Sequence, residues 1–113
     1  MKKVMISQRM KDVPDDVIQK NRKELEAHIR NNLFPHEDVE IVDSYFEDYP
    51  ASTIPNKPVW YLGKSIQKLA DADALVVEAG ANEARGCKIE ITVAHAYGID
   101  VYDLGSSEVD SPH

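Results

Sequence analysis

The feature that most constrains the fold of this chain is an almost continuous apolar run, Ala-Leu-Val-Val-Glu-Ala, at residues 74–79. A strand with one solvated face alternates apolar and polar residues, whereas a strand of a parallel sheet is covered on both faces and is apolar along its length. Asp71 and Asp73 precede the run, and we interpret them as capping or solvated groups. The run therefore predicts the central strand of a sheet that carries helices on both faces.

Strand-like and helix-like segments alternate along the rest of the chain. Strands are expected at residues 3–7, 39–46 and 100–104, and helices at residues 12–33, 58–71 and 86–98. Parallel sheets with right-handed crossover helices have this order of elements. We therefore expect an α/β fold, namely a small flavodoxin-like or Rossmann-like three-layer sandwich with a parallel sheet of about four strands. The strands at residues 3–7 and 74–79 should be central.

The first two helices carry local signals for their ends and for their buried faces. Asp12 is expected to cap the first helix, with Pro14 in its first turn, and Pro58 fits the first turn of the second helix. Apolar residues recur at helical spacing in both helices: Ile18, Leu25, Ile29 and Leu33, then Leu62, Ile66 and Leu69. Trp60 and Tyr61, near the start of the second helix, are interpreted as a helix-packing contact or a subunit interface rather than a surface that stacks on a base.

Length and charge restrict the class of protein. At 113 residues the chain fits one domain, expected at residues 1–105, with a flexible tail at residues 106–113. The formal net charge of −7 argues against a broad basic surface for a nucleic-acid polymer or for anionic lipid. No apolar run approaches the roughly 20 residues of a membrane span, so we expect no membrane association and a cytoplasmic location.

Neither a cofactor nor a metal is expected. The single cysteine, Cys87, excludes an intrachain disulfide and a cysteine-based zinc cluster, and the four histidines lack paired metal-ligand spacing. The loop at residues 80–87, Gly-Ala-Asn-Glu-Ala-Arg-Gly-Cys, lacks the Walker and dinucleotide glycine patterns. Two alternatives for this loop stay open: it holds a single phosphate on the N–H groups of the third helix with help from Arg85, or it is an ordinary strand-to-helix turn.

Glu90 lies where the third helix should be apolar. At about 100° per residue, Lys88, Thr92 and His95 share one face of this helix, and Glu90 falls on the opposite face together with Tyr97. Burying an unpaired charge is unfavourable, so a carboxylate on a packed face is paired, hydrogen-bonded or directed into a polar cleft. Glu90 is therefore the first candidate for a functional residue.

Two interpretations of Glu90 remain open from spacing alone. It can act as a nucleophile or general base, its ionised form favoured by a nearby helix N-terminus. It can instead form a buried ion pair, for which Arg85 is the nearest cation in the sequence. Cys87, by contrast, is interpreted as a packed core residue, because His95 is eight residues farther along the helix and faces solvent.

Three segments are expected to converge at one edge of the sheet: residues 7–10, residues 78–86 and the first turns of the third helix. In an open parallel sheet the ligand lies beyond the carboxyl ends of the strands, where the connections of two neighbouring strands diverge. This topology places Glu90 beside the expected cleft.

Three motifs span most of the chain. They are Val-Met-Ile-Ser-Gln-Arg-Met at residues 4–10, Ser-Ile-Gln-Lys-Leu-Ala-Asp-Ala-Asp-Ala-Leu-Val-Val at residues 65–77, and Gly-Cys-Lys-Ile-Glu at residues 86–90, followed by Ala94 and Gly98. Together these motifs resemble the nucleoside 2-deoxyribosyltransferase-like superfamily, and in particular a small, poorly characterised branch of it.

In that family the equivalent of Glu90 attacks the anomeric carbon of a 2-deoxyribosyl group and releases the base, and another base or water then displaces it. The resemblance therefore implies a glycosyl-enzyme ester on Glu90. It also implies a homo-oligomer in which a neighbouring subunit completes the site. The substrate, a small nucleoside or nucleotide, is expected to contact the following residues: Ser7, Gln8, Arg9, Met10, Ser65, Gly80, Arg85 and Gly86.

The chain departs from the family where helper groups are expected. Met5 stands in place of a tyrosine, Ser65 in place of an aspartate, Ala84 in place of an aspartate or serine, and Arg9 in place of a proline. Two functions of different class follow. The first is an enzyme that cleaves or transfers at the N-glycosidic bond of a nucleoside or nucleotide. The second is a binding module that keeps the fold and recognises a nucleotide or ADP-ribose-like ligand without turnover.

Overall fold

The computed structural model describes residues 1–10, 12–42 and 55–105. In chain order its strands and α-helices are β1 (Lys2–Ser7), α1 (Asp15–His28), β2 (Val39–Val42), α2 (Lys57–Leu69), β3 (Ala74–Val77), α3 (Arg85–Ala96) and β4 (Asp100–Asp103). A π-helical turn, η1 (Ile29–Leu33), extends α1, and a 3-10 turn, η2 (Ala81–Glu83), precedes α3. The predicted alternation of strands and helices is confirmed. Three parts of the chain lie outside the described residues: residues 43–46 of the second predicted strand, residues 47–54 after it, and the predicted tail at 106–113.

The four strands form one parallel sheet in the order β2-β1-β3-β4. The two central strands are β1 and β3, as the sequence predicts, and Ser7 at the end of β1 is paired with Val77 at the end of β3. The chain leaves β1 toward β2 on one side and returns to β3 on the other. The connections that follow β1 and β3 therefore diverge at the carboxyl edge of the sheet, which is where open α/β sheets bind ligands.

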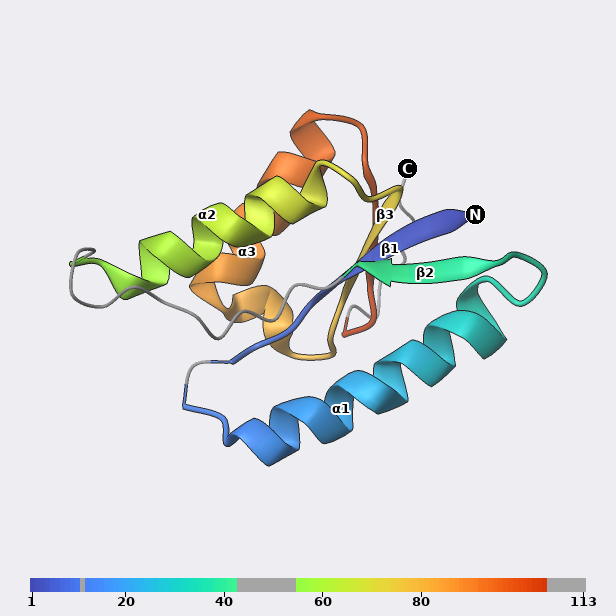
Figure 1. Ribbon diagram of the computed structural model, residues 1–113, viewed down its shortest axis with the longest axis horizontal. Helices are drawn as coiled ribbons and strands as arrows, with labels where there is room; N and C mark the ends of the chain where they lie inside the picture. Colours follow the sequence, from blue (N-terminus) through green and yellow to red (C-terminus); the bar gives the residue numbers. More distant parts are fainter. Residues whose placement is uncertain (11, 43–54, 106–113) are drawn as a thin grey trace.

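Helices cover both faces of the sheet, which gives a three-layer sandwich (Figure 1). One face packs against α1 and η1 through Val4, Ile6 and their neighbours, and the other packs against α2 and α3 through Met5, Leu75 and Val77. All four residues of β3 have no exposed surface. This double coverage explains why the sequence of β3 is apolar without alternation.

The structure differs from the sequence predictions at the first residues of α1 and α2. Asp12 does not cap α1: the N-cap is Pro14, without a side-chain hydrogen bond, and Asp12 adopts a left-handed φ of 64°. Pro14 is favourable there because it has no N–H to satisfy, and its carbonyl accepts the N–H groups of Val17 and Ile18. At α2, Asn56 supplies the cap, since its Oδ1 accepts the Val59 N–H at 3.1 Å.

The predicted burial of α3 is confirmed except at its carboxyl end. Lys88, Thr92 and His95 are exposed, and Glu90 is buried. Tyr97 was expected on the packed face, but its residue surface is 79% exposed. The helix ends at Ala96, so residue 97 does not continue the rotation of about 100° per residue on which that expectation rests.

Candidate active site

The carboxylate of Glu90 meets the carboxyl end of the central strand β1. Ser7, the last residue of β1, donates its Oγ–H to Glu90 Oε1 at 2.5 Å. Both residues are buried, with 1% of Ser7 and 7% of Glu90 exposed. This hydrogen bond joins two residues that are 83 positions apart in the sequence. Among the described residues, Glu90 is the only acidic residue that is buried.

The spacing of the buried residues in α3 places Glu90 next to Ser7. Cys87, Glu90 and Ala94 are its three buried positions, at intervals of three and four residues. This interval keeps the three side chains on one face of a helix with 3.6 residues per turn. Ala94 is fully buried and small, so the helix backbone can approach the sheet closely below the carboxylate.

A second hydroxyl acts on the same carboxylate from another element. Burial raises the pKa of Glu90 above its ordinary value, while hydrogen bonds from Ser7 and from Ser65 of α2 lower it in part. The net shift is upward because desolvation disfavours the charged form more than the two hydroxyls favour it. Residues from β1, α2 and α3 therefore build one site around Glu90.

The ion-pair interpretation of Glu90 finds no support in the described part of the chain. Arg85, the cation proposed from the sequence, is exposed at the first position of α3. Within the described ranges Glu90 forms no ion pair, and Arg85 forms none either. The carboxylate is instead held by neutral hydroxyl donors, which leave its charge uncompensated.

The raised pKa of Glu90 predicts a specific dependence of stability on pH. Below the ordinary value of 4.5 the group is protonated in both the folded and the unfolded chain. As pH rises, the unfolded chain loses this proton first, so the free energy of unfolding falls until pH passes the folded pKa, and is then constant. The Glu90→Gln variant lacks this loss.

Urea unfolding of wild type and Glu90→Gln across pH 4 to 8 measures the effect, because all other titrating groups cancel in the difference. We expect the stability of the wild type relative to the variant to decrease with rising pH. A difference that is flat or increases over this range would show that burial does not dominate the environment of Glu90.

Cys87 lies one turn before Glu90 and shares its surroundings. Burial raises the pKa of the Cys87 thiol to about 11; a hydrogen bond with Ser7 opposes this shift, and the negative charges of Glu90 and Glu78 add to it. A thiol with such a pKa is protonated at neutral pH and is a poor nucleophile. The environment thus favours the interpretation of Cys87 as a packed residue over that of a reactive one.

Gln8 follows Ser7 but faces the opposite helix layer. Its Nε2 donates to the carbonyl of Ile18 at 3.2 Å, and its Oε1 accepts from Arg22 Nη1 at 3.2 Å. Arg22 also donates to the Val42 carbonyl at 3.4 Å and lies 3.7 Å from a carboxylate oxygen of Glu26. These contacts make Gln8 part of an internal network that ties the ends of β1 and β2 to α1.

Two further predicted binding residues lie in the loop after β1. Arg9 is exposed, and its backbone N–H donates to Glu78 Oε1 at 3.2 Å. Met10 is half-buried, and its carbonyl accepts the N–H of Val13 at 3.2 Å. Glu78 also donates its own N–H to the Ser7 carbonyl at 2.9 Å, so it links the ends of the two central strands.

The loop between β3 and α3 supplies Gly80, Arg85 and Gly86. Gly80 has a φ of 85°, a left-handed conformation that glycine adopts without strain, and it opens the turn η2. Asn82 of this turn donates to Asp103 Oδ2 at 3.0 Å, which ties the loop to β4. Arg85 and Gly86 form the first turn of α3, so Gly86 lies one turn before Glu90. The other predicted binding residues thus lie at the carboxyl edge of the sheet. Ser65 instead reaches Glu90 from the middle of α2.

Two residues at the site were not singled out as functional from the sequence. Cys87 contacts Ser7, and Glu78 connects β1 to β3 and acts electrostatically on Cys87. Glu78 could have been identified from the sequence, because a polar residue directly after a buried strand of a parallel sheet lies at the edge that binds ligands. For Cys87 the sequence offers only one indication, its position one helical turn before Glu90.

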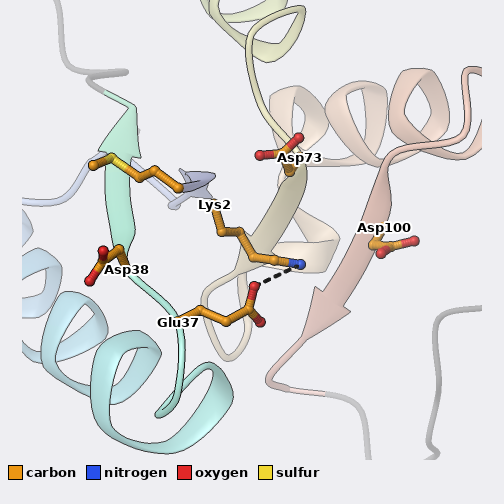
Figure 2. Close-up of a pocket in the computed structure, with 6 residues that line it drawn as sticks. Lys2, Glu37, Asp38, Asp73 and Asp100 are labelled. Carbon is orange, nitrogen blue, oxygen red and sulfur yellow. Dashed lines mark ion pairs between the residues drawn. The ribbon is translucent and has the colours of Figure 1, made fainter.

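An open hollow lies at the opposite, amino edge of the sheet, far along the strands from Glu90. Figure 2 shows its lining, in which Lys2 Nζ reaches toward Glu37 at 4.0 Å. The lining residues are Met1, Lys2, Glu37, Asp38, Asp73 and Asp100. Lys3 donates its N–H to Asp73 Oδ2 at 2.8 Å, so this carboxylate, just before β3, accepts a backbone hydrogen bond from β1. The hollow does not share a residue with the Glu90 site.

The described residues hold neither a cluster of metal-ligating side chains nor a helix fit to cross a membrane. Across residues 1–10, 12–42 and 55–105, His, Cys, Asp and Glu side chains do not gather into a group of three that could hold a metal ion. In the same part of the chain, no helix combines the length and the apolar character that a bilayer crossing requires.

The arrangement as a whole is suited to covalent chemistry by a carboxylate. A buried glutamate whose only partners are hydroxyl donors is oriented but poorly solvated, and both properties favour attack on an electrophilic carbon.

Comparison with protein-family models, curated proteins and solved structures finds no match for this chain. The geometry of the Glu90 site is therefore the main indication of a function.

Proposed function

We propose that this protein is a nucleoside 2-deoxyribosyltransferase-like enzyme, which cleaves or transfers at the N-glycosidic bond of a nucleoside or nucleotide with Glu90 as the nucleophile. The observation that carries the proposal is the buried carboxylate of Glu90, hydrogen-bonded by Ser7 at 2.5 Å at the carboxyl end of a central parallel strand. This is the edge at which open α/β sheets bind their ligands. The resemblance of the motifs at residues 4–10, 65–77 and 86–90 to that superfamily supports the same assignment.

The proposed reaction has two displacement steps at one carbon. A Glu90 carboxylate oxygen attacks the anomeric carbon of the sugar and forms an ester, while the bond from that carbon to the base nitrogen breaks and its electron pair leaves with the base. The departing base takes up one proton. An acceptor base or a water molecule then attacks the same carbon, loses a proton, and releases the Glu90 carboxylate.

The hydroxyls around Glu90 have a defined part in this reaction. Ser7 and Ser65 orient the carboxylate by donating to it, and neither supplies a counter-charge that would lower its reactivity. Because Ser7 is hydrogen-bonded to Oε1, we assign the attack on the sugar to the other oxygen, Oε2. Arg85 and the first-turn N–H groups of α3 are available for a phosphate on the substrate.

A specific observation favours a second candidate, a binding module without turnover. Met5 lies on the same face of β1 as Ser7 and is fully buried, in the position where the family supplies a tyrosine hydroxyl. Ser65 stands where an aspartate is expected to assist the base. A pocket that keeps the fold and lacks these groups would bind a nucleotide or ADP-ribose-like ligand and leave it intact.

We also propose that the protein acts as a homo-oligomer in the cytoplasm, with the start of α2 at the subunit contact. Val59 is 61% exposed there, next to Trp60 and Tyr61, whose rings lie edge to face at 4.9 Å. Trp60 and Tyr61 are half-buried, and an exposed valine beside two half-buried aromatic rings is typical of interfaces.

The test of the catalytic proposal is release of free base by the wild-type protein. It is incubated with 2′-deoxynucleosides and their 5′-monophosphates, with and without an acceptor base, and the products are separated by chromatography. We expect base release, and after acid quenching we expect a mass increase of one 2-deoxyribosyl group on the peptide that contains Glu90. Dependence of release on the acceptor distinguishes transfer from hydrolysis.

Absence of base release from every compound would contradict the catalytic proposal. Calorimetric titration of the same compounds, followed by chromatography of the recovered ligand, then tests the second candidate. Saturable binding with the ligand intact supports a binding module. Absence of both turnover and binding contradicts both candidates.

A further inference from the structure

The side chains of Ser7 and Gln8 leave the end of β1 toward opposite layers of the sandwich. Ser7 Oγ donates to Glu90 Oε1 at 2.5 Å on the α3 side, whereas Gln8 Nε2 donates to the Ile18 carbonyl of α1 at 3.2 Å. Both residues are buried. Successive side chains of an extended chain point to opposite faces, so a rotation of the backbone at residue 8 also turns the Ser7 hydroxyl.

The orientation of the Gln8 amide follows from what its partners can offer. A guanidinium only donates, so the Gln8 atom that meets Arg22 Nη1 at 3.2 Å is Oε1. A carbonyl only accepts, so Nε2 is the atom that faces Ile18. Both ends of the amide are thus engaged on the α1 side, with Gln8 and Arg22 buried there.

This anchor holds the end of β1 on the side where the described sheet gives it no pairing. In the described part of the chain, β2 ends at Val42, which is paired with Met5, and Ser7 is paired with β3 alone. Arg22 donates both to the Val42 carbonyl at 3.4 Å and to Gln8. The guanidinium therefore links the end of β2 to the residue that follows β1.

We infer that Gln8 is a positioning residue, whose anchored amide holds the Ser7 hydroxyl against the Glu90 carboxylate on the other face of the sheet. Without the anchor, residue 8 can turn, and the Ser7 donor moves away from Glu90. Gln8 thus acts on the ligand through Ser7 and not by contact with it. This inference deepens the proposed function and rests on it for its catalytic meaning.

The test is a double-mutant cycle of Gln8→Met and Ser7→Ala, followed by NMR titration of the Glu90 carboxyl carbon in the whole chain. Methionine is uncharged and similar in length to glutamine, so it removes the anchor without adding or removing a charge near Glu90. We expect the midpoint to rise in each single variant, because the ionised carboxylate loses its donor. In the double variant we expect no rise beyond that of Ser7→Ala. Additive rises would show that Gln8 does not act through Ser7, and would overturn the inference.

Leu25→Ala is the control for a loss of stability as such. Leu25 is buried on α1 in the cluster that contains Val4 and Ile6, on the same face of the sheet as the Gln8 anchor. Its truncation destabilises the core, and we expect the Glu90 midpoint to keep its wild-type value. Equal rises in Leu25→Ala and Gln8→Met would show a general loosening and would also overturn the inference.

A second variant keeps the test decisive if Gln8→Met does not fold. Arg22→Lys then takes its place in the cycle, because an ammonium group does not bridge Gln8 and the Val42 carbonyl as the planar guanidinium does. We expect the same pattern: a higher Glu90 midpoint in the single variant and no further rise in the Ser7→Ala background. An unchanged midpoint in Arg22→Lys, or a rise that adds to that of Ser7→Ala, would overturn the inference.

Base release is the second readout of the cycle. We expect kcat to fall about 10-fold in Gln8→Met with KM unchanged, the effect of one hydrogen bond on a rate, and not to fall further when Ser7 is already alanine. A rise in KM with kcat unchanged would instead make Gln8 a ligand contact. If the midpoints behave as expected while the wild type releases no base, the positioning role stands and the proposed function fails. If base is released and Gln8→Met changes neither the midpoint nor kcat, the inference alone fails.

Discussion

Glu90→Gln is expected to lower the rate of base release by a factor on the order of 10³ or more, the scale seen when a covalent nucleophile is removed. Glutamine is nearly identical in shape and its amide oxygen can still accept the Ser7 hydrogen bond, so the site keeps its geometry. An amide oxygen, however, does not form an ester with the anomeric carbon. The loss should therefore appear in kcat, and the mass adduct on the peptide that contains residue 90 should disappear.

The matched control for this change is Glu83→Gln. Glu83 is a glutamate of the neighbouring turn η2, and its side chain is 81% exposed and lies 3.8 Å from Lys88 Nζ. We expect this variant to retain wild-type rates, because an exposed ion pair contributes little. A Glu90→Gln protein that folds normally and still releases base at the wild-type rate would remove the covalent role from Glu90.

The fold could be predicted from the sequence because each element carries its own local signal. The apolar run at β3 identifies a strand covered on both faces, and the alternation of elements restricts the sheet to parallel pairing. The placement of Glu90 on the packed face of α3 follows from helical periodicity alone and is confirmed. The signals for single elements depend on residues close together in the sequence, and the parallel pairing depends only on the order of those elements.

The interior of the site could not be predicted in the same way. The bond from Ser7 to Glu90 joins residues from opposite ends of the chain, and the side-chain contact between Ser7 and Cys87 requires the register of α3 on the sheet. No periodicity within α3 indicates that register. The cap at α1 was predicted wrongly for a related reason, since Asp12 and Pro14 both match sequence preferences and only the backbone geometry selects between them.

The second large effect is expected in the network beneath the site. Replacing Arg22 with methionine should lower the free energy of unfolding by about 2–4 kcal/mol. Methionine keeps an apolar stem of similar length but removes the donors to Gln8 Oε1 and to the Val42 carbonyl, both of which then lie buried without this partner. Gln8 directly follows Ser7, so the same network holds the end of β1 on which the Glu90 contact depends.

Urea unfolding of Arg22→Met measures this loss, and Arg30→Met provides the matched control on the same helical stretch. Arg30 lies 3.7 Å from Glu26 and donates to the Val39 carbonyl at 3.4 Å, but its side chain is 47% exposed, so water can replace its contacts. We expect a loss below about 1 kcal/mol for Arg30→Met. Equal losses in the two variants would mean that burial adds nothing to the Arg22 network, whereas a loss confined to Arg22→Met identifies the buried guanidinium as the group that fixes the carboxyl ends of β1 and β2.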